Sequence, residues 1–351
     1  MLIKKDPSKL RDIKKIGVYI GVPGLGDLLF IMPLFRALKQ LFPGARVVFI
    51  GKLLREYVRP VFDSCSYIDG LLEFHLYESR SWGDFQKFVD ELRSEKFDLI
   101  VDTQRKFMPS MLLALGHPRF MVSYSSNQVF SDFKVNTADR DKRHTADVSL
   151  DLVRALGMKN PSPELELTIP EKSKMYAEEF LTGHGIVSGD RLAGLIPSAG
   201  HPSRNWNIKK FANLADMLHY ELYCKVICFG SPADKTTINE LTSMVSAPVI
   251  VEDFSRKSIL DSAALMARCS VIVGVDSGPL HVADAAGAPC VGIFGPTLPD
   301  RFGLLGRNHR EICLYAECTP CSDINCVHRK CLEDITMESV FETAHDVLGT
   351  K

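Results

Sequence analysis

Short apolar runs alternate with amphipathic stretches along most of the 351-residue chain. Runs that are apolar at every position are typical of parallel strands buried on both faces, and amphipathic stretches are typical of helices packed on a sheet. The predicted strands are 16–20, 46–50, 98–102, 192–196, 225–229, 249–251, 271–275 and 290–294, and the predicted helices are 28–41, 83–95, 110–115, 144–156, 173–184, 208–220, 280–287 and 337–348. The pattern therefore predicts an α/β fold.

Two prolines interrupt this alternation near the middle of the chain. The segment 160–163 reads Asn-Pro-Ser-Pro, which ends a predicted helix, and the strand–helix units resume after it. Because 351 residues are enough for two domains, we predict domains at 1–170 and 171–351 with a linker near 167–174.

The most informative polar segment, 275–284, joins a predicted strand to a predicted helix. In an open α/β sheet, ligands bind at the carboxyl ends of the strands, and the free N–H groups of a helix N-terminus attract phosphate. Asp276, Ser277 and His281 supply hydrogen-bonding side chains there. Gly278 lets a ligand approach the backbone. A second interpretation, in which Asp276 and Ser277 only cap the helix, stays open from these residues alone.

A glycine-rich loop stands between the first predicted strand and an apolar helix. Gly21, Gly24 and Gly26 precede Asp27, a composition typical of a tight turn, and their spacing differs from the G-x-G-x-x-G dinucleotide motif. Asp27 is either a helix-capping residue or a carboxylate placed at a ligand site.

Two more polar loops follow predicted strands in the second half of the chain. The first contains Ser198, Ser203, Arg204 and Trp206, and its arginine is either a solvated cation or an anion ligand. The second contains Asp234, whose position suits a helix cap as well as a ligand contact.

Together these loops resemble the signatures of the heptosyltransferases, glycosyltransferase family nine. The carboxyl-half signature is similar to 276–289 followed by 292–297, and the amino-terminal motif resembles 26–29 followed by 32–38 and 42–45. The resemblance implies a GT-B fold, in which two Rossmann-like domains face each other across a cleft. It makes the amino half the acceptor-binding domain and the carboxyl half the nucleotide-sugar-binding domain.

The resemblance also implies a reaction, the inverting transfer of a sugar, usually heptose from ADP-heptose, onto a lipopolysaccharide inner-core acceptor. It makes Asp27 the general base, with Gly24 and Gly26 in the acceptor-side loop. A carboxylate that takes the proton of the attacking hydroxyl contributes about 10²–10⁴-fold to the rate.

On the donor side, the resemblance implies that Asp234 contacts the nucleotide ribose and that the stretch 257–260 flanks the base. The other donor-binding residues that it implies are Ser198, Arg204, Asp276, Ser277, Gly278 and His281. The family usually has lysine where this chain has Arg204, and an arginine can grip a phosphate with two nitrogens. Because this cation and a helix N-terminus can offset the charge of a leaving diphosphate, we expect that catalysis requires no metal or other cofactor.

Two other function classes fit the same fold, a non-catalytic nucleotide-sugar-binding module and a nucleotide-sugar epimerase. Asp27 argues against the binding module, which needs no base. An epimerase typically needs several acid or base groups around the sugar, and only Asp27 and His281 are evident.

Composition narrows the class of partner. The chain is 46% hydrophobic and 24% charged, as in packed globular proteins, and its net charge of −1 gives no electrostatic footprint for nucleic acid. The start lacks the apolar core of a signal peptide, and no apolar run approaches ~20 residues. We expect a cytoplasmic protein, and the family resemblance adds peripheral contact with the cytoplasmic face of the inner membrane.

The chain has ten cysteines, of which Cys224, Cys228, Cys269 and Cys290 lie in apolar segments and are expected to be buried thiols. Four others, Cys318, Cys321, Cys326 and Cys331, fall close together near the carboxyl end. Such a group favours a metal over a disulfide framework in a cytoplasmic chain. Free or partly paired thiols, a structural zinc site and an iron–sulfur or redox site all remain open. We expect this tail to support structure and not chemistry.

Overall fold

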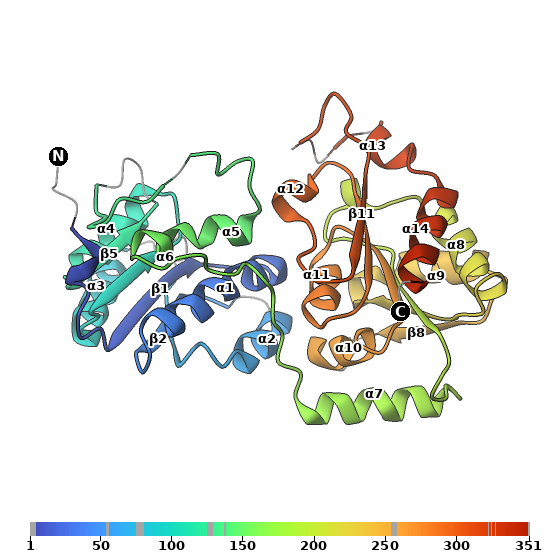
Figure 1. Ribbon diagram of the computed structural model, residues 1–351, viewed down its shortest axis with the longest axis horizontal. Helices are drawn as coiled ribbons and strands as arrows, with labels where there is room; N and C mark the ends of the chain where they lie inside the picture. Colours follow the sequence, from blue (N-terminus) through green and yellow to red (C-terminus); the bar gives the residue numbers. More distant parts are fainter. Residues whose placement is uncertain are drawn as a thin grey trace. The chain divides into compact units, whose positions relative to one another are not determined.

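The computed structural model describes residues 5–53, 56–74, 81–124, 129–136, 138–253, 258–321, 323, 325–326 and 328–349. The chain divides into two compact units, Met1–Pro163 and Glu164–Lys351, each an α/β unit with its own sheet (Figure 1). The division falls just before the segment 167–174, in which the sequence predicts the linker.

The described part of the amino-terminal unit contains a parallel sheet of five strands in the order β3-β2-β1-β4-β5. These are β1 (Lys15–Gly21), β2 (Arg46–Gly51), β3 (Gly70–Glu73), β4 (Leu99–Asp102) and β5 (Phe120–Ser123). The three strands predicted in this half are confirmed. The sequence pattern did not predict β3, which is only partly buried, or β5, which is buried and four residues long.

The helices of this unit are α1 (Leu25–Leu41), α2 (Arg59–Ser64), α3 (Trp82–Glu95), α4 (Phe107–Leu115), α5 (Thr145–Ser149) and α6 (Asp151–Ala155), with 3₁₀ turns at Pro7–Lys9 and Glu56–Val58. Helix α1 begins three residues before its predicted start because Gly24 takes an extended conformation as its N-cap. The helix predicted at 144–156 is two short helices. The Leu150 amide donates to the Asp147 carbonyl, a tightened turn that separates them.

The described part of the carboxyl-terminal unit contains a parallel sheet of six strands in the order β11-β10-β9-β6-β7-β8. These are β6 (Leu192–Ile196), β7 (Lys225–Gly230), β8 (Val249–Asp253), β9 (Val271–Val275), β10 (Cys290–Phe294) and β11 (His309–Cys313). The five predicted strands of this half are confirmed. Strand β11 was not predicted, because it lies at the sheet edge and carries charged residues between its apolar ones.

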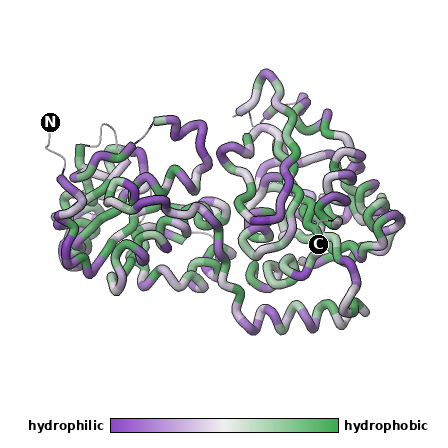
Figure 2. The backbone as a smooth tube through the Cα atoms, viewed as in Figure 1, coloured by the Kyte–Doolittle hydropathy of each residue, from purple (hydrophilic) through white to green (hydrophobic). Residues whose placement is uncertain are grey.

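The described helices of this unit are α7 (Glu171–Gly183), α8 (Ile208–Tyr220), α9 (Lys235–Met244), α10 (Ile259–Met266), α11 (Gly278–Ala285), α12 (Pro299–Phe302), α13 (Lys330–Glu333) and α14 (Met337–Gly349), with 3₁₀ turns at Pro202–Arg204 and Pro232–Asp234. Strands β6, β9 and β10 are buried at every residue, and Figure 2 colours the hydrophobic residues of the chain green. Helix α14 packs against α8 and against β9, β10 and β11, so the end of the chain is part of this core.

The strand order of each sheet places one pair of loops side by side. In the amino-terminal unit the chain leaves β1 for β2 and β3 and returns beside β1 as β4. In the other unit it leaves β6 for β7 and β8 and returns beside β6 as β9. Ligands of open parallel sheets bind at such switch points, at the carboxyl ends of the strands. The loops after β1 and β4, and those after β6 and β9, are therefore the candidate sites.

Candidate functional site

Asp276 lies at the centre of the switch point in the carboxyl-terminal unit, directly after β9, and only 3% of its surface is exposed. Its Oδ1 lies 3.3 Å from Nε2 of His281. Its Oδ2 accepts a hydrogen bond from Thr297 Oγ1 and lies 3.3 Å from Nη1 of Arg204. The structure thus brings Asp276 and His281 from one predicted motif together with Arg204 from another. Thr297, which belongs to the second part of the carboxyl-half signature, joins them.

Burial opposes ionisation of Asp276, but the hydrogen bond and charge of His281, together with Thr297 and Arg204, hold the pKa of Asp276 below its usual range. The carboxylate is therefore ionised and fixed on both oxygens. The Arg204 side chain stays 42% exposed, so its guanidinium is held by Asp276 and remains accessible to an anion.

Ser277 and Gly278 form the start of helix α11. Ser277 is the N-cap residue, but its side chain makes no capping hydrogen bond. Its Oγ is buried and has no hydrogen-bond partner among the residues that the structure describes. The interpretation of this loop as a simple helix cap is therefore wrong for Ser277. A buried hydroxyl without a partner, beside the free N–H groups of a helix, is suited to an anionic ligand.

The loop after β6 brings Arg204 to this place. Ser198 follows β6 and is buried. The Ala199 amide donates to Asn205 Oδ1 at 2.8 Å, which closes the loop around the 3₁₀ turn that ends at Arg204. Trp206, also in this loop, is a core residue whose Nε1 donates to the Ile335 carbonyl at 3.1 Å.

Asp234 follows β7, the next strand of the sheet, and closes its own turn. Its Oδ2 accepts hydrogen bonds from the amide and the hydroxyl of Ser231, at 2.8 and 2.5 Å. This is the local role that the sequence left open beside a ribose contact. In the stretch predicted to flank the base, Lys257 lies outside the described residues, and Ser258 caps helix α10 through the Leu260 amide.

At the switch point of the amino-terminal unit, a cavity of about 300 Å³ lies beside the loops after β1 and β4. It is lined by Ile20, Val22, Pro23, Asp27, Phe30, Ile31, Thr103, Gln104, Arg105, Tyr124, Thr145, Val148 and Ser149. Asp27 is exposed, and its Oδ2 accepts a hydrogen bond from the Gly24 amide at 3.0 Å. The carboxylate therefore closes the first turn of α1 and also lines the cavity, so the two interpretations of Asp27 are compatible.

Most polar groups of this cavity are already bonded to the protein backbone. The donors are Thr103 Oγ1 to Tyr19, Gln104 Nε2 to Ile20, Tyr124 Oη to Val148 and Ser149 Oγ to Ala146. Within the described residues, Thr145 Oγ1 is buried without a hydrogen-bond partner. Arg105 is exposed and makes one long ion pair, at 3.5 Å, with Asp141. A ligand here would meet Asp27, Thr145 and Arg105.

Below this cavity lies Asp102, the buried last residue of β4. Its Oδ1 accepts from the Gln104 amide at 2.9 Å, and its Oδ2 accepts from the hydroxyls of Ser110 and Ser123. Burial raises the pKa of Asp102 to about 6, although these three hydrogen bonds act in the opposite direction. None of the predicted motifs includes Asp102, Gln104, Arg105 or Thr145. The sequence feature that could have predicted a site here is the group of polar residues that directly follows the predicted strand at 98–102.

The four cysteines of the tail differ in exposure: Cys318 is exposed, Cys321 and Cys326 are half-buried, and Cys331 is buried. Burial, with the neighbouring thiols of Cys318 and Cys326, raises the pKa of Cys331. Across the described residues, which include these cysteines, no group of three or more His, Cys, Asp or Glu side chains is arranged to hold a metal ion. The thiols predicted to be buried, Cys224, Cys228, Cys269 and Cys290, are buried.

Helix length and polarity bear on membrane insertion. Among the helices that the structure describes, none combines the length and the apolar character that crossing a membrane requires.

A family model and a known relative each match most of the chain. Residues 85–332 match the family model described as glycosyltransferase family 9 (heptosyltransferase). The chain is 24% identical over 280 residues to lipopolysaccharide heptosyltransferase 3 of Escherichia coli, an alignment that covers 78% of this chain and 81% of that protein.

Solved structures share the fold. The family 9 glycosyltransferase of Veillonella parvula superposes with a TM-score of 0.82 at 25% identity, and E. coli ADP-heptose lps heptosyltransferase II with a TM-score of 0.73 at 19% identity. Each alignment covers 96% of this chain and 98% of the other. The two Rossmann-like units are those of the GT-B fold, and the protein belongs to glycosyltransferase family 9.

Proposed function

We propose that this glycosyltransferase is an inverting heptosyltransferase, which moves heptose from ADP-heptose onto a lipopolysaccharide inner-core acceptor. The description of the matching family and the names of the relatives support the sugar and the acceptor class. The observation that carries the proposal is the group formed by Arg204, Asp276 and Ser277 at the N-terminus of α11, which suits a diphosphate.

In this proposal the donor diphosphate lies at the N-terminus of α11. The Gly278 amide, the Ser277 hydroxyl and the Arg204 guanidinium donate to its oxygens, whereas Pro279, the next residue of the helix, has no N–H to donate. Asp276 does not contact the phosphates, because its negative charge would repel them. Both of its oxygens are also already paired, one with His281 and the other with Thr297 and Arg204. It orients Arg204, and His281 in turn orients Asp276.

The remaining donor contacts are part of the same proposal. Ser198 is the small residue beside the phosphates at the end of β6, and Asp234, at the end of β7, is the candidate for the ribose. Because a positioned charge that meets a developing anion contributes about 2–4 kcal/mol, Arg204 can help ADP to leave, and the mechanism requires no divalent ion.

The acceptor binds, in this proposal, in the cavity that Asp27 lines, on the loop of Gly24 and Gly26. Thr145 Oγ1 and Arg105 are the groups of this cavity with bonding capacity to spare. The acceptor hydroxyl oxygen bonds to the anomeric carbon as the bond from that carbon to the phosphate oxygen breaks. Asp27 takes the hydroxyl proton, and ADP leaves with the electron pair of the broken bond.

Because the acceptor is lipid-linked, this proposal includes contact of the protein with the membrane surface that presents it. A binding assay with vesicles that contain the acceptor tests this part separately from catalysis.

The test is incubation with ADP-heptose and with other nucleotide sugars, each with and without a lipid A–Kdo acceptor. The proposal predicts that ADP is released only when ADP-heptose and acceptor are both present. An isomer of the donor formed without acceptor would identify an epimerase instead, and donor binding without turnover would identify a binding module.

A further inference from the structure

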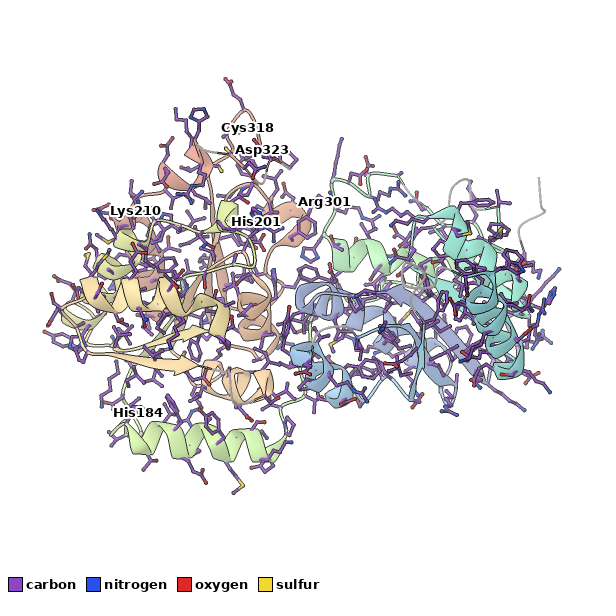
Figure 3. All side chains as sticks on the ribbon, turned by 180° about the vertical axis from the view of Figure 1, so that it is seen from behind. His184, His201, Lys210, Arg301, Cys318 and Asp323 are labelled. Atoms are coloured by element: carbon purple, nitrogen blue, oxygen red, sulfur yellow. The ribbon has the colours of Figure 1, made fainter. Side chains whose placement is uncertain are left out.

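The segment between β11 and α14 contacts the loop after β10, which carries Thr297, and the loop after β6, which carries Arg204. The Cys321 amide donates to the Pro296 carbonyl at 2.9 Å, one residue before Thr297. Leu332 is buried beneath Gly295, where an added Cβ would lie 2.5 Å from the leucine side chain. Figure 3 places Cys318 and Asp323 on the same side of this unit as His201. This tail therefore adjoins the donor site and is not a separate appendage.

Arg329 reaches from the tail to the loop of Arg204. Its Nη1 lies 3.4 Å from the Pro202 carbonyl and 3.5 Å from the Asn205 carbonyl, and its Nη2 donates to Glu333 Oε1 at 3.1 Å. The two carbonyls stand on either side of Arg204 in sequence. One guanidinium thus contacts both ends of the turn that presents the donor-side cation.

Glu333 and the residues after it fix the other end of the same loop. Glu333 Oε2 accepts from Asn207 Nδ2 at 3.4 Å, and Lys210 Nζ donates to the carbonyls of Glu333 and Ile335 at 2.5 and 2.9 Å. Trp206 is anchored to the Ile335 carbonyl. These contacts hold the start of α8. In the described part of the tail, Arg329 is the residue whose side chain hydrogen-bonds to the turn itself.

We infer that Arg329 is a positioning residue of the donor site, which holds the Pro202–Arg204 turn so that Arg204 stays paired with Asp276. Among the described residues, no other hydrogen bond or ion pair joins a tail side chain to Arg204 or to the turn. Because Arg204 is 42% exposed, its ion pair alone leaves it considerable freedom, and the fixed backbone on both sides limits that freedom. The inference rests on the proposed function only in that Arg204 meets a nucleoside diphosphate.

A double-mutant cycle tests this role, with ADP as the probe and calorimetry as the readout. Arg329→Ala should weaken ADP binding about 10-fold, the effect of losing roughly one charge-assisted hydrogen bond. In a background that already carries Arg204→Ala, the same substitution should leave ADP affinity unchanged, because no guanidinium remains to be positioned. A residue that only stabilised the tail would weaken binding equally in both backgrounds.

Three further variants sharpen the test. Arg329→Lys, which keeps a cation and a donor, should recover part of the lost affinity. Arg310→Ala is the matched control, since Arg310 is an exposed arginine on β11 whose Nη1 donates to the neighbouring His309 carbonyl. If thermal melting shows that Arg329→Ala does not fold, Arg329→Lys and Arg329→Gln take its place in the cycle.

The outcomes separate this inference from the proposed function. If Arg204→Ala weakens ADP binding and Arg329→Ala does not, or if Arg329→Ala acts equally in both backgrounds, the positioning role is overturned and the proposed function stands. Failure of the wild-type protein to bind ADP, or an Arg204→Ala variant that binds as the wild type does, would overturn both.

Discussion

Two buried aspartates, Asp102 in the amino-terminal unit and Asp276 in the carboxyl-terminal unit, end or directly follow the strands beside the two switch points, and their partners differ. Asp276 is paired with Arg204 and His281, and these partners hold its pKa down. Asp102 has hydroxyls and an amide instead, and burial raises its pKa to about 6. Asp276 holds a cation in place, and Asp102 holds the start of the loop after β4 through hydrogen bonds.

This difference fits the catalytic role that we propose for each unit. A departing diphosphate needs fixed positive charge, and the carboxyl-terminal site holds a cation on a buried anion. An incoming hydroxyl needs an accessible base, and in the amino-terminal cavity Asp27 is exposed while neighbouring polar groups are bonded to the backbone.

The largest effect is expected for Asp27→Asn. An amide cannot take the proton of the acceptor hydroxyl, so kcat should fall about 10²–10⁴-fold while ADP affinity stays unchanged. Asp84→Asn is the control, because Asp84 occupies the same N3 position of α3 and accepts from the Ser81 amide without lining the cavity. Near wild-type turnover of the Asp27 variant would leave this residue with its capping role alone.

Substitutions on the donor side should instead weaken nucleotide binding. Arg204→Ala should lose about 2–4 kcal/mol of interaction with ADP, roughly 30- to 1000-fold in Kd, and should also lower kcat. Asp276→Ala should weaken binding in the same direction, because Arg204 loses its partner. Calorimetric titration with ADP measures both effects, and unchanged affinity in both variants would remove these residues from the site.

The same account predicts that enzyme treated with a chelator keeps its activity, since no divalent ion takes part in the proposed step. A strict requirement for added Mg²⁺ or Mn²⁺ would contradict that mechanism.

A pH effect on stability is expected from Asp102. Its pKa is raised by folding from 3.8 to about 6, so the folded state favours the protonated form. The stability that this form contributes is complete below the unfolded pKa and is lost as the pH rises through about 6. Relative to wild type, Asp102→Asn should gain up to about 3 kcal/mol in unfolding free energy between about pH 4 and pH 7. Urea titrations of both proteins measure this, and a gap that does not change with pH would show that Asp102 does not titrate in that range.

The smallest effect on activity is expected in the cysteine tail. A structural zinc site formed by Cys318, Cys321, Cys326 and Cys331 would be tetrahedral with Zn–S distances of about 2.3 Å, and the described residues do not show such an arrangement. Replacing Cys318 and Cys321 together by serine should lower the melting temperature and leave the folded fraction active, because Arg329 and Glu333 make the contacts to the donor loop.

Elemental analysis of protein purified without added metal decides the zinc question. Less than about a tenth of an equivalent of zinc or iron would reject the metal site. A double variant that is fully stable and inactive would place the tail in the active site.

The sequence predicted long, buried elements well and short or edge elements poorly. Strands such as β9 and β10 are apolar at nearly every position, so their pattern is unambiguous. Strands β3 and β11 are partly buried and carry charged residues, so they resemble loops. The sequence pattern predicts one helix where the structure has α5 and α6, because a single tightened turn does not interrupt the apolar pattern.

The donor side could be predicted further than the acceptor side, for a physical reason. Its residues Arg204, Asp276, Ser277 and His281 belong to two local motifs at strand ends. Thr145 lies far along the chain from Asp27, and only the folded structure brings both to one cavity. The contacts of Arg329 with the loop of Arg204 likewise span more than a hundred residues of sequence.

The most direct test of the account is the stereochemistry of a single transfer. Wild-type protein is incubated with ADP-heptose and a lipid A–Kdo acceptor, and the product is analysed by mass spectrometry and NMR. The account predicts one ADP released for each heptosyl group gained by the acceptor, with the anomeric configuration inverted relative to the donor. A retained configuration, or turnover of ADP-heptose without any gain of mass by the acceptor, would contradict it.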